Sequence, residues 1–340
     1  MILVNYFLTG AYTMEYGDAS GTALLDIRSR KWSKRILEAI DPDRNLLEAL
    51  PGLIEADACA GRVTKQAALL LGIPEGVFVS SGGGDNMMGA IGTGTVQDGT
   101  LTMSLGTSGT IYGASDKPMV DPHGLLAAFC SSTGSWLPLL CTMNCTVASE
   151  VTRNLFSKGV KDFDAIAMTA PIGSNGVVML PYFNGERTPN YPRGKGCLMG
   201  LGLDTMTEAN ISRAAMESSI FGLKLGLKSF QDLGYAPKEI RLIGGGSKSL
   251  VWRQMVADIC GLPVIIPKIT EAAALGGALQ ALWSFRRSQG EQVEIREIVA
   301  EHVSLETSSA CFPVAEQVAA YQAAYELYTS YVRVVEPLFS

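Results

Sequence analysis

The sequence predicts an α/β protein of two domains that enclose a ligand cleft. Its 340 residues are enough for two domains with a large core. A short apolar run, three glycines and a helical pattern follow one another twice, at Gly82–Gly84 and at Gly244–Gly246. The second copy continues into another apolar run and another helical pattern, which completes a β-α-β-α unit. Because ligands of α/β proteins lie at the carboxyl ends of strands, two glycine-rich turns there predict a cleft between the domains.

The chain before the first triple glycine predicts short elements that alternate with turns. Ser33 precedes a helical pattern and supplies a hydroxyl that can cap it, and glycines end two other patterns. The expected elements are a helix over 3–8 closed by Gly10, a turn-rich loop over 17–22, a hydrophobic run over 23–27, a helix from Ser33 to Ile40 and a helix over 63–71 that stops at Gly72.

The chain after the central stretch predicts a β-rich segment followed by alternating strands and long helices. Residues 291–309 are weakly patterned. The expected elements are a hairpin of 125–130 and 136–141, a helix over 146–156, a strand over 176–180, a polar loop over 181–194, a helix over 208–233, a strand over 240–243, a helix from Ser249 to Gly261, a strand over 264–266, a helix over 271–285 and a closing helix over 321–338.

Residues 77–110 carry the strongest chemical signal. Three glycines precede Asp85 and Asn86, and such a loop costs backbone entropy unless the backbone approaches a ligand or needs a positive φ. The turn over 104–110 consists of glycines and small hydroxyl residues beside one leucine, a composition that suits a phosphate-binding hairpin. A carboxylate loop so close to a phosphate-like loop predicts a proton acceptor beside a phosphoryl group.

Each of these motifs also has a structural interpretation. No G-x-x-x-x-G-K-[ST] sequence is present, and residues 89–94 have the wrong spacing for G-x-G-x-x-G. Asp85 is equally suited to cap the helix that follows it, and the two roles are compatible. The second triple glycine would also serve close packing of a strand against a helix.

Composition excludes several classes of partner. The net charge of −6, without a run of Lys or Arg, argues against a nucleic-acid partner. Seven scattered cysteines without a C-x-x-C pair favour reduced thiols in the cytoplasm. Only two histidines are present, which excludes a His-rich metal site, so no metal ligand is assigned. The apolar residues 1–8 are too short to span a bilayer and lack a basic flank, so we expect no membrane partner.

Taken in order, the motifs resemble those of the FGGY family of sugar kinases, and within it the xylulokinases. The resemblance covers nearly the whole chain and is specific because the motifs occur in one order. The matching segments are 17–22 (GDASGT), 82–86 (GGGDN), 104–109 (SLGTSG), 185–189 (GERTP), 196–201 (GCLMGL) with 210–217, and 244–249 (GGGSKS) with 252–254.

The resemblance implies a fold like that of actin and hexokinase, with two ribonuclease-H-like domains around a cleft. It implies transfer of the γ-phosphoryl group of ATP, which is carried with Mg²⁺, to a sugar hydroxyl. The first expected substrate is D-xylulose, which would be converted to D-xylulose 5-phosphate. The implied site residues are Asp85 as general base, Gly106, Thr107 and Ser108 for the ATP phosphates, Gly244, Gly245, Gly246 and Ser249 for the adenosine, and Asp18, Asn86, Glu186 and Arg187 on the sugar side. For Glu186 and Arg187, an interdomain ion pair is the favoured alternative.

Other functions remain open at this stage. Gluconokinases, ribulokinases and glycerol kinases share the family pattern, and a non-catalytic actin-like protein or pseudokinase is the rival from another class. Sugar and ATP are the expected small-molecule partners, and a homodimer is included among the expected assemblies.

The family's early D-x-G-T-type loop has no counterpart in residues 1–16. We therefore expect residues 1–93 to be the C-terminal remnant of the sugar-binding domain, and residues 94–340 to be the nucleotide-binding domain. Apolar residues of the remnant should then pack poorly, namely Leu24, Leu25, Ile27, Val77 and Val79. We also expect this chain to lack sugar kinase activity until the missing segment is restored.

Overall fold

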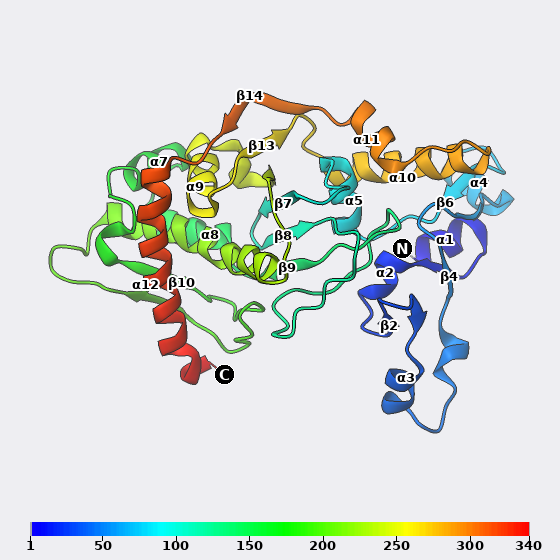
Figure 1. The fold of residues 1–340 in the computed structure, drawn as a ribbon, viewed down its shortest axis with the longest axis horizontal. Helices are drawn as coiled ribbons and strands as arrows, with labels where there is room; N and C mark the ends of the chain where they lie inside the picture. Colours follow the sequence, from blue (N-terminus) through cyan, green and yellow to red (C-terminus); the bar gives the residue numbers. More distant parts are fainter. Residues whose placement is uncertain (1, 340) are drawn as a thin grey trace.

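The structure, a computed structural model that describes residues 2–339, is arranged around a six-stranded sheet (Figure 1). The strand order is β14-β13-β12-β7-β8-β9, in which β7, β12 and β13 run parallel and the other three pair antiparallel with their neighbours. The strands are β7 (Thr100–Leu105), β8 (Gly109–Gly113), β9 (Leu139–Thr142), β12 (Glu239–Ile243), β13 (Val264–Pro267) and β14 (Leu305–Cys311).

Helices cover both faces of this sheet because its strands alternate between two apolar sets. Leu101 and Met103 belong to the larger core, with α8, α9 and α12, whereas Tyr112 and Leu139 belong to a second core, with α5, α10 and α11. The elements outside the sheet are α5 (Asp85–Thr93), α6 (Thr146–Leu155), α7 (Val160–Ala167), η2 (Ser174–Gly176), β10 (Val178–Pro181), β11 (Gly196–Met199), α8 (Glu208–Asp232), η3 (Gly245–Lys248), α9 (Leu250–Cys260), α10 (Ala272–Ser288), α11 (Ile295–His302) and α12 (Ala315–Phe339).

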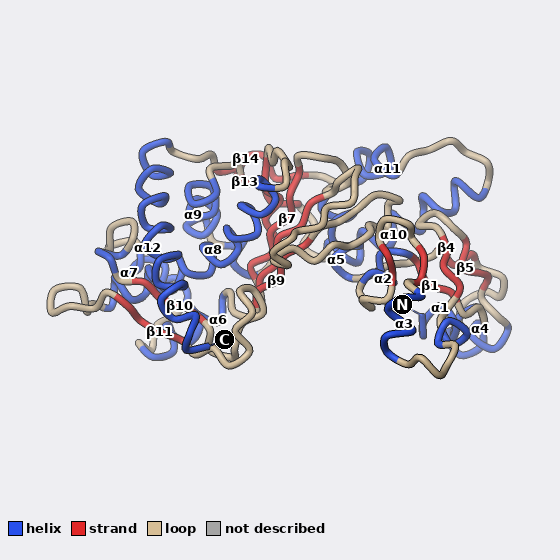
Figure 2. Tube along the Cα trace, turned by 60° about the horizontal axis from the view of Figure 1, so that its bottom comes forward, coloured by secondary structure: helices blue, strands red, loops and turns tan. Residues whose placement is uncertain are grey.

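The residues before α5 form three small sheets rather than one large one, at the right of Figure 1. β1 pairs parallel with β4, while β2–β3 and β5–β6 are antiparallel pairs. Both views place α10 beside this part, and α10 contacts β5 and β6 (Figures 1 and 2). The elements are α1 (Ile2–Thr9), β1 (Thr13–Glu15), α2 (Tyr16–Ser20), β2 (Leu25–Asp26), β3 (Lys31–Trp32), α3 (Lys34–Ile40), η1 (Leu46–Ala49), β4 (Gly52–Ile54), β5 (Cys59–Arg62), α4 (Lys65–Leu71) and β6 (Phe78–Ser80).

Most predicted elements are present, and capping explains their boundaries. The Ser33 hydroxyl accepts a hydrogen bond from Ile36 N and caps α3, and the Thr64 hydroxyl caps α4. Gly72 and Gly261 end α4 and α9 in the left-handed conformation, at φ of 67° and 68°.

Several predictions from sequence were wrong. The loop expected over 17–22 contains α2, since the carboxylate of Glu15 caps a short helix there. In the expected hairpin only β9 is a strand, and residues 125–130 contribute isolated bridges instead. The weakly patterned segment 291–309 holds α11 and most of β14, while β1, α7 and β11 were not predicted. Short elements of this kind depend on distant partners more than on their own pattern.

The helices α5 and α10 cross in close contact through glycine. A Cβ atom at Gly92 would overlap the carbonyl oxygen of Ala272, and one at Gly276 would overlap that of Met88. Glycine is therefore required at both positions for the two backbones to approach. This crossing fixes where α5 lies.

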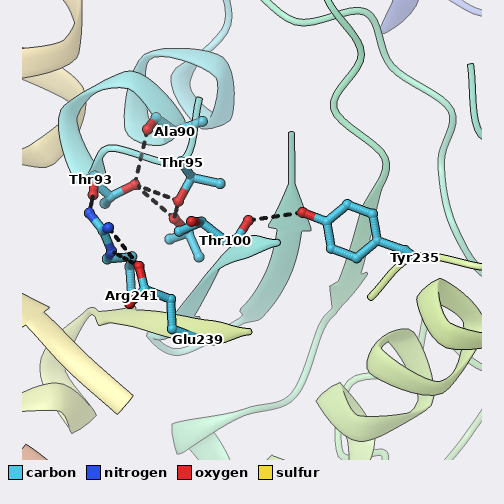
Figure 3. A network of polar contacts seen from close by, with 8 residues as sticks. Ala90, Thr93, Thr95, Thr100, Tyr235, Glu239 and Arg241 are labelled. Atoms are coloured by element: carbon cyan, nitrogen blue, oxygen red, sulfur yellow. Dashed lines mark hydrogen bonds and ion pairs between the residues drawn. The ribbon is translucent and has the colours of Figure 1, made fainter. Parts of the chain in front are cut away.

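A polar network ties the end of α5 to the sheet (Figure 3). The hydroxyls of Thr93 and Thr95 each lie 2.7 Å from that of Thr102 on β7, and all three residues are buried. Arg241 of β12 donates to the carbonyl of Thr93 at 2.7 Å and pairs with Glu239 at 2.6 Å. A cation at the carboxyl end of a helix is favourable, so this network holds α5 in register with β7.

Glu15 connects the residues before α5 to a distant turn. Its side chain is fully buried, and it accepts hydrogen bonds from Gly17 N at 2.8 Å, Asp18 N at 3.3 Å and the Ser132 hydroxyl at 2.9 Å. Ser132 in turn contacts Gly83, where a Cβ would overlap its hydroxyl. The carboxylate therefore joins α2, the turn at residue 132 and the triple glycine before α5.

The expectation of poor packing near residues 24–27 was partly wrong. Leu25 and Ile27 are 6% and 9% exposed, because they pack in a small core with Cys130 and Trp136. The indole N–H of Trp136 donates to the Ile27 carbonyl at 3.0 Å. Val77 is exposed, and Leu24 and Val79 are half-buried.

Among residues 2–339, no helix combines the length and the apolar character needed to pass through a bilayer.

The helix crossing predicts opposite effects for two neighbouring glycines of α10. Gly276→Ala should destabilise the protein by roughly 1–3 kcal/mol or more, since the added methyl overlaps backbone. Gly277→Ala is the matched control, because its Cβ would meet only the Met88 sulfur, at 3.9 Å. That variant should gain about 0.5–1 kcal/mol from helix propensity. Urea unfolding measures both, and equal stabilities would contradict the crossing as described.

Glu15 predicts a pH-dependent contribution to stability. Burial raises its pKa from 4.5 to about 7, against the opposing effect of hydrogen bonds from Gly17, Ser132 and Asp18. Because the folded-state pKa is the higher one, the folded state binds this proton more tightly. Its stabilising effect is complete below pH 4.5 and is lost as pH rises to about 7. This pKa shift corresponds to on the order of 3 kcal/mol in the free energy of unfolding.

Glu15→Gln removes this titration, so the variant should gain stability relative to the parent protein as pH rises through that window. Urea unfolding of both proteins between about pH 5 and about pH 8 measures the gain. Glu38→Gln, an exposed position on α3, is the control and should show none. Parallel pH curves for the parent protein and the Glu15 variant would contradict the prediction.

Candidate functional site

Asp85 is the first residue of α5, and the cap position before it is taken by Gly84. The prediction that Asp85 caps the helix was therefore wrong by one residue. Its side chain is exposed, and its Oδ1 accepts hydrogen bonds from the backbone N–H of Asn86 at 2.8 Å and from the Asn86 amide at 3.2 Å. No donor among residues 2–339 reaches Oδ2. Asn86 thus orients the carboxylate and leaves one oxygen able to accept a proton.

Two contacts fix the middle and the far end of α5 over the sheet. Thr93, at the far end of the helix, bonds to Thr102 near the middle of β7. Gly89 lies over Tyr112, whose hydroxyl would be 2.7 Å from a Cβ at Gly89. Tyr112 pairs with Thr102, so both contacts lie near the middle of β7, and the first residue of the helix lies one turn beyond Gly89.

The charge of Asp85 acts on two sheet residues near this end. Burial raises the pKa of the Tyr112 hydroxyl, a hydrogen bond with Thr102 opposes the rise, and the charge of Asp85 adds to it. Burial likewise raises the pKa of the Cys141 thiol on β9, and Asp85 again adds to the rise. Cys141 pairs with Thr110, which pairs with Ser104, so the effect on the thiol indicates that Asp85 lies toward the carboxyl end of β7.

The turn between β7 and β8 lies at the same end of the sheet. Leu105 pairs with Gly109, and between them Thr107 and Ser108 are exposed. The carbonyls of Gly106 and Thr107 accept hydrogen bonds from Thr146 N at 3.0 Å and Cys145 N at 2.9 Å. With those carbonyls occupied, the turn has N–H groups and hydroxyls left for a ligand. Because α6 begins beside the turn, its N-terminus also favours an anion there.

A cavity of about 710 Å³ joins this turn to the second triple glycine. Of the predicted residues, Gly106, Thr107, Gly245, Gly246 and Ser249 line it, whereas Ser108, Gly244 and Asp85 do not. Its other lining residues come from the ends of β7, α6, α7, η3 and α9, and include Thr146, Arg153, Lys161, Phe163, Lys248 and Trp252. The cavity has the size and the mixed polar and apolar lining of a small-molecule site.

The three glycines at 244–246 have different roles. A Cβ at Gly244 would lie 2.6 Å from the carbonyl oxygen of Leu105, and one at Gly246 would lie 2.8 Å from the Leu105 Cβ. These two positions therefore serve close packing against β7, which was the alternative considered from the sequence. A Cβ at Gly245 would have nothing within 4 Å, and Gly245 lines both the main cavity and a neighbouring one of about 500 Å³.

Ser249 is occupied within the protein. Its hydroxyl accepts from Trp252 N at 3.4 Å, which caps α9, and donates to Asp164 of α7 at 2.6 Å. Burial raises the pKa of Asp164, and the bond from Ser249 opposes the rise. Ser249 thus holds the start of α9 against α7 while it lines the cavity.

The cationic residues of the cavity were not predicted from the sequence. Arg153 of α6 forms an ion pair with Glu150 at 2.6 Å, and Lys161 of α7 is exposed at the cavity. The sequence pattern that could have predicted α7 is the helical spacing of Phe163 and Ala167, which are both buried.

The predicted sugar-side residues lie in two places. Asp18 is in α2, next to Gly17. A Cβ atom at Gly17 would lie 3.1 Å from the Cγ of Met87, so α2 neighbours the first turn of α5. Glu186 is 3% exposed, and its carboxylate accepts hydrogen bonds from the segment after β9. The interdomain ion pair expected for Glu186 and Arg187 is absent among residues 2–339.

Comparison with known proteins shows which family the chain resembles. Residues 2–92 match the N-terminal domain, and residues 101–285 the C-terminal domain, of the FGGY family of carbohydrate kinases. The xylulose kinase of Haemophilus influenzae is 44% identical over 329 residues, which cover 97% of this chain and 66% of that protein.

Solved structures show the same fold. The xylulose kinase from Lactobacillus acidophilus superposes with a TM-score of 0.90 at 24% identity, over 99% of this chain and 67% of the other. The gluconate kinase from the same organism gives 0.88 at 23% identity, over 98% and 66%. The predicted α/β two-domain kinase fold is therefore confirmed.

The chain spans between about half and two thirds of the length of the relatives it matches. Within that span, both family domains match in the order predicted from the motifs. The chain belongs to the FGGY family of carbohydrate kinases.

Proposed function

We propose that the protein transfers the γ-phosphoryl group of ATP to a hydroxyl of D-xylulose, giving D-xylulose 5-phosphate. The observation that carries this proposal is one cavity that joins the turn after β7 to the second triple glycine, with Asp85 at the start of the helix packed on the same strand. The name of the 44% identical relative, xylulose kinase, supports the choice of sugar.

In the proposed reaction the two parts of the chain have separate roles, divided near residue 93. The turn 106–108 and the N-terminus of α6 bind the phosphates, and the backbone at Gly245 lies against the adenosine. Mg²⁺ would be carried by the nucleotide and would help to neutralise the charge of its phosphates. Asp85 accepts the proton of the attacking hydroxyl, while Asn86 holds it in place.

Gluconate is the second candidate substrate. The gluconate kinase structure superposes almost as well as the xylulose kinase, so the fold does not select the sugar. A phosphorylation panel of xylulose, ribulose, gluconate and glycerol with the full-length protein separates the candidates. The highest kcat/KM for xylulose is expected, and a higher value for another substrate would reassign the sugar. Absence of phosphorylation for all four would favour a non-catalytic protein.

Asp85→Asn should lower kcat by ~10²–10⁴-fold, because the general base is lost, and leave nucleotide affinity nearly unchanged. Steady-state kinetics and nucleotide titration measure the two effects. Asp204→Asn, in an exposed loop, is the control and should behave as the parent protein. More than a third of the parent kcat in the Asp85 variant would rule out its role as base.

Gly245→Val should weaken ATP binding about tenfold or more without unfolding the protein, since its side chain would enter open space where the nucleotide lies. Calorimetric titration measures the affinity, and thermal unfolding checks the fold. Gly202→Val serves as the control, because its Cβ would meet only the Thr205 hydroxyl, at 3.6 Å. Unchanged ATP affinity in the Gly245 variant would show that this glycine does not contact the nucleotide.

A further inference from the structure

The loop that carries Arg187 is fixed by a buried carboxylate. Glu186 accepts hydrogen bonds from Met143 N at 2.6 Å, from Asn144 N at 3.2 Å and from the Asn144 amide at 3.0 Å. The same carboxylate accepts from the backbone N–H of Arg187 at 2.7 Å. The Thr188 hydroxyl donates to the Cys141 carbonyl at 2.9 Å. Arg187 therefore has its backbone held against the end of β9 on both sides.

The segment to which this loop is fixed also contacts the phosphate-binding turn. Thr142 of β9 pairs with Gly109, and Cys145 N donates to the Thr107 carbonyl at 2.9 Å. Residues 141–146 thus lie between the Arg187 loop and the turn 106–108. Only this one segment therefore separates the Arg187 loop from the groups assigned to the phosphates.

The charges of Arg187 and Asp85 both lie near Cys141. The side chain of Arg187 is exposed, and it has no ion-pair partner among residues 2–339. Burial raises the pKa of the Cys141 thiol, the nearby Arg187 guanidinium opposes the rise, and Asp85 and Glu186 add to it. Since the cation and the proposed base both act on one thiol, both lie within electrostatic reach of Cys141.

An arginine fixed in this way and left without a carboxylate partner suits an anionic ligand. Its planar guanidinium donates two parallel hydrogen bonds to phosphate oxygens, which a lysine does not reproduce. The carboxylate of its neighbour Glu186 accepts hydrogen bonds from backbone and amide N–H groups, and it forms no ion pair with the guanidinium among residues 2–339.

We propose that Arg187 binds the phosphoryl group while it passes from ATP to the sugar, an assignment that rests on the proposed kinase function. In that step the bond between the γ-phosphorus and the bridging oxygen breaks, and its electron pair leaves with ADP. The sugar oxygen forms the new bond to phosphorus and gives its proton to Asp85. Arg187 contacts the equatorial oxygens, whose charge the protein must neutralise.

The test compares ATP with ADP, because ADP lacks the group that Arg187 binds. Arg187→Met should weaken ATP binding about tenfold or more and leave ADP binding unchanged. It should also lower kcat on the order of 10³-fold with little change in the KM for the sugar. Arg187→Lys, which keeps the charge without the fork, should recover part of both losses. Arg333→Met, an exposed arginine on α12, is the matched control and should show neither effect.

Each other outcome overturns the assignment in a distinct way. Equal losses for ATP and ADP would show a general effect of charge, and a change confined to the KM of the sugar would show a sugar contact. Unchanged values would show that Arg187 faces solvent only. The binding arm needs no turnover, so it tests Arg187 even if the sugar is misassigned. Absence of ATP and ADP binding in the parent protein would overturn the proposed function together with this inference.

Discussion

The close crossing of α5 with α10 is the constraint on which the proposed site depends. The two backbones approach so closely that neither Gly92 nor Gly276 has room for a side chain. Thr93, Thr95 and Thr102 then fix the register of α5 on the sheet, and Arg241 binds its last turn. As a helix is a rigid element, fixing its far end and its middle also fixes its first residue. The position of Asp85 is therefore set by contacts of later residues of α5.

Buried carboxylates hold the segments around the site. Glu15, Glu186 and Glu217 are each at most 3% exposed, and each accepts several hydrogen bonds from backbone or side-chain donors. Glu217 also pairs with the buried Arg213 at 2.7 Å. A buried charge is costly unless such donors surround it, so each of these residues organises its neighbourhood. Glu15 does so behind the triple glycine of α5, and Glu186 does so for the loop of Arg187.

The site combines closely packed and open glycines within single motifs. Gly244 and Gly246 allow the turn after β12 to approach β7, whereas Gly245 faces two cavities. Gly83 similarly contacts Ser132, and Gly84 takes the cap position of α5. The turn 244–246 thus combines two glycines that allow close packing with one that faces open space. Only the space around each Cα distinguishes the two.

The sequence by itself determined the fold class, most long elements and the family. Periodic apolar residues, caps such as Ser33 and terminal glycines such as Gly72 and Gly261 act over a few residues, so they are visible in the chain. Motif order then indicated Asp85, the turn 106–108 and the turn 244–246 as candidates.

The tertiary structure alone decided how these candidates are used. It showed that Glu186 is internal, that Ser249 is bonded to Asp164, and that α7 contributes Lys161 to the cavity. It also brought residues 130–136 against residues 15–27. These facts depend on contacts between segments far apart in the chain, and no local pattern of residues encodes such distances.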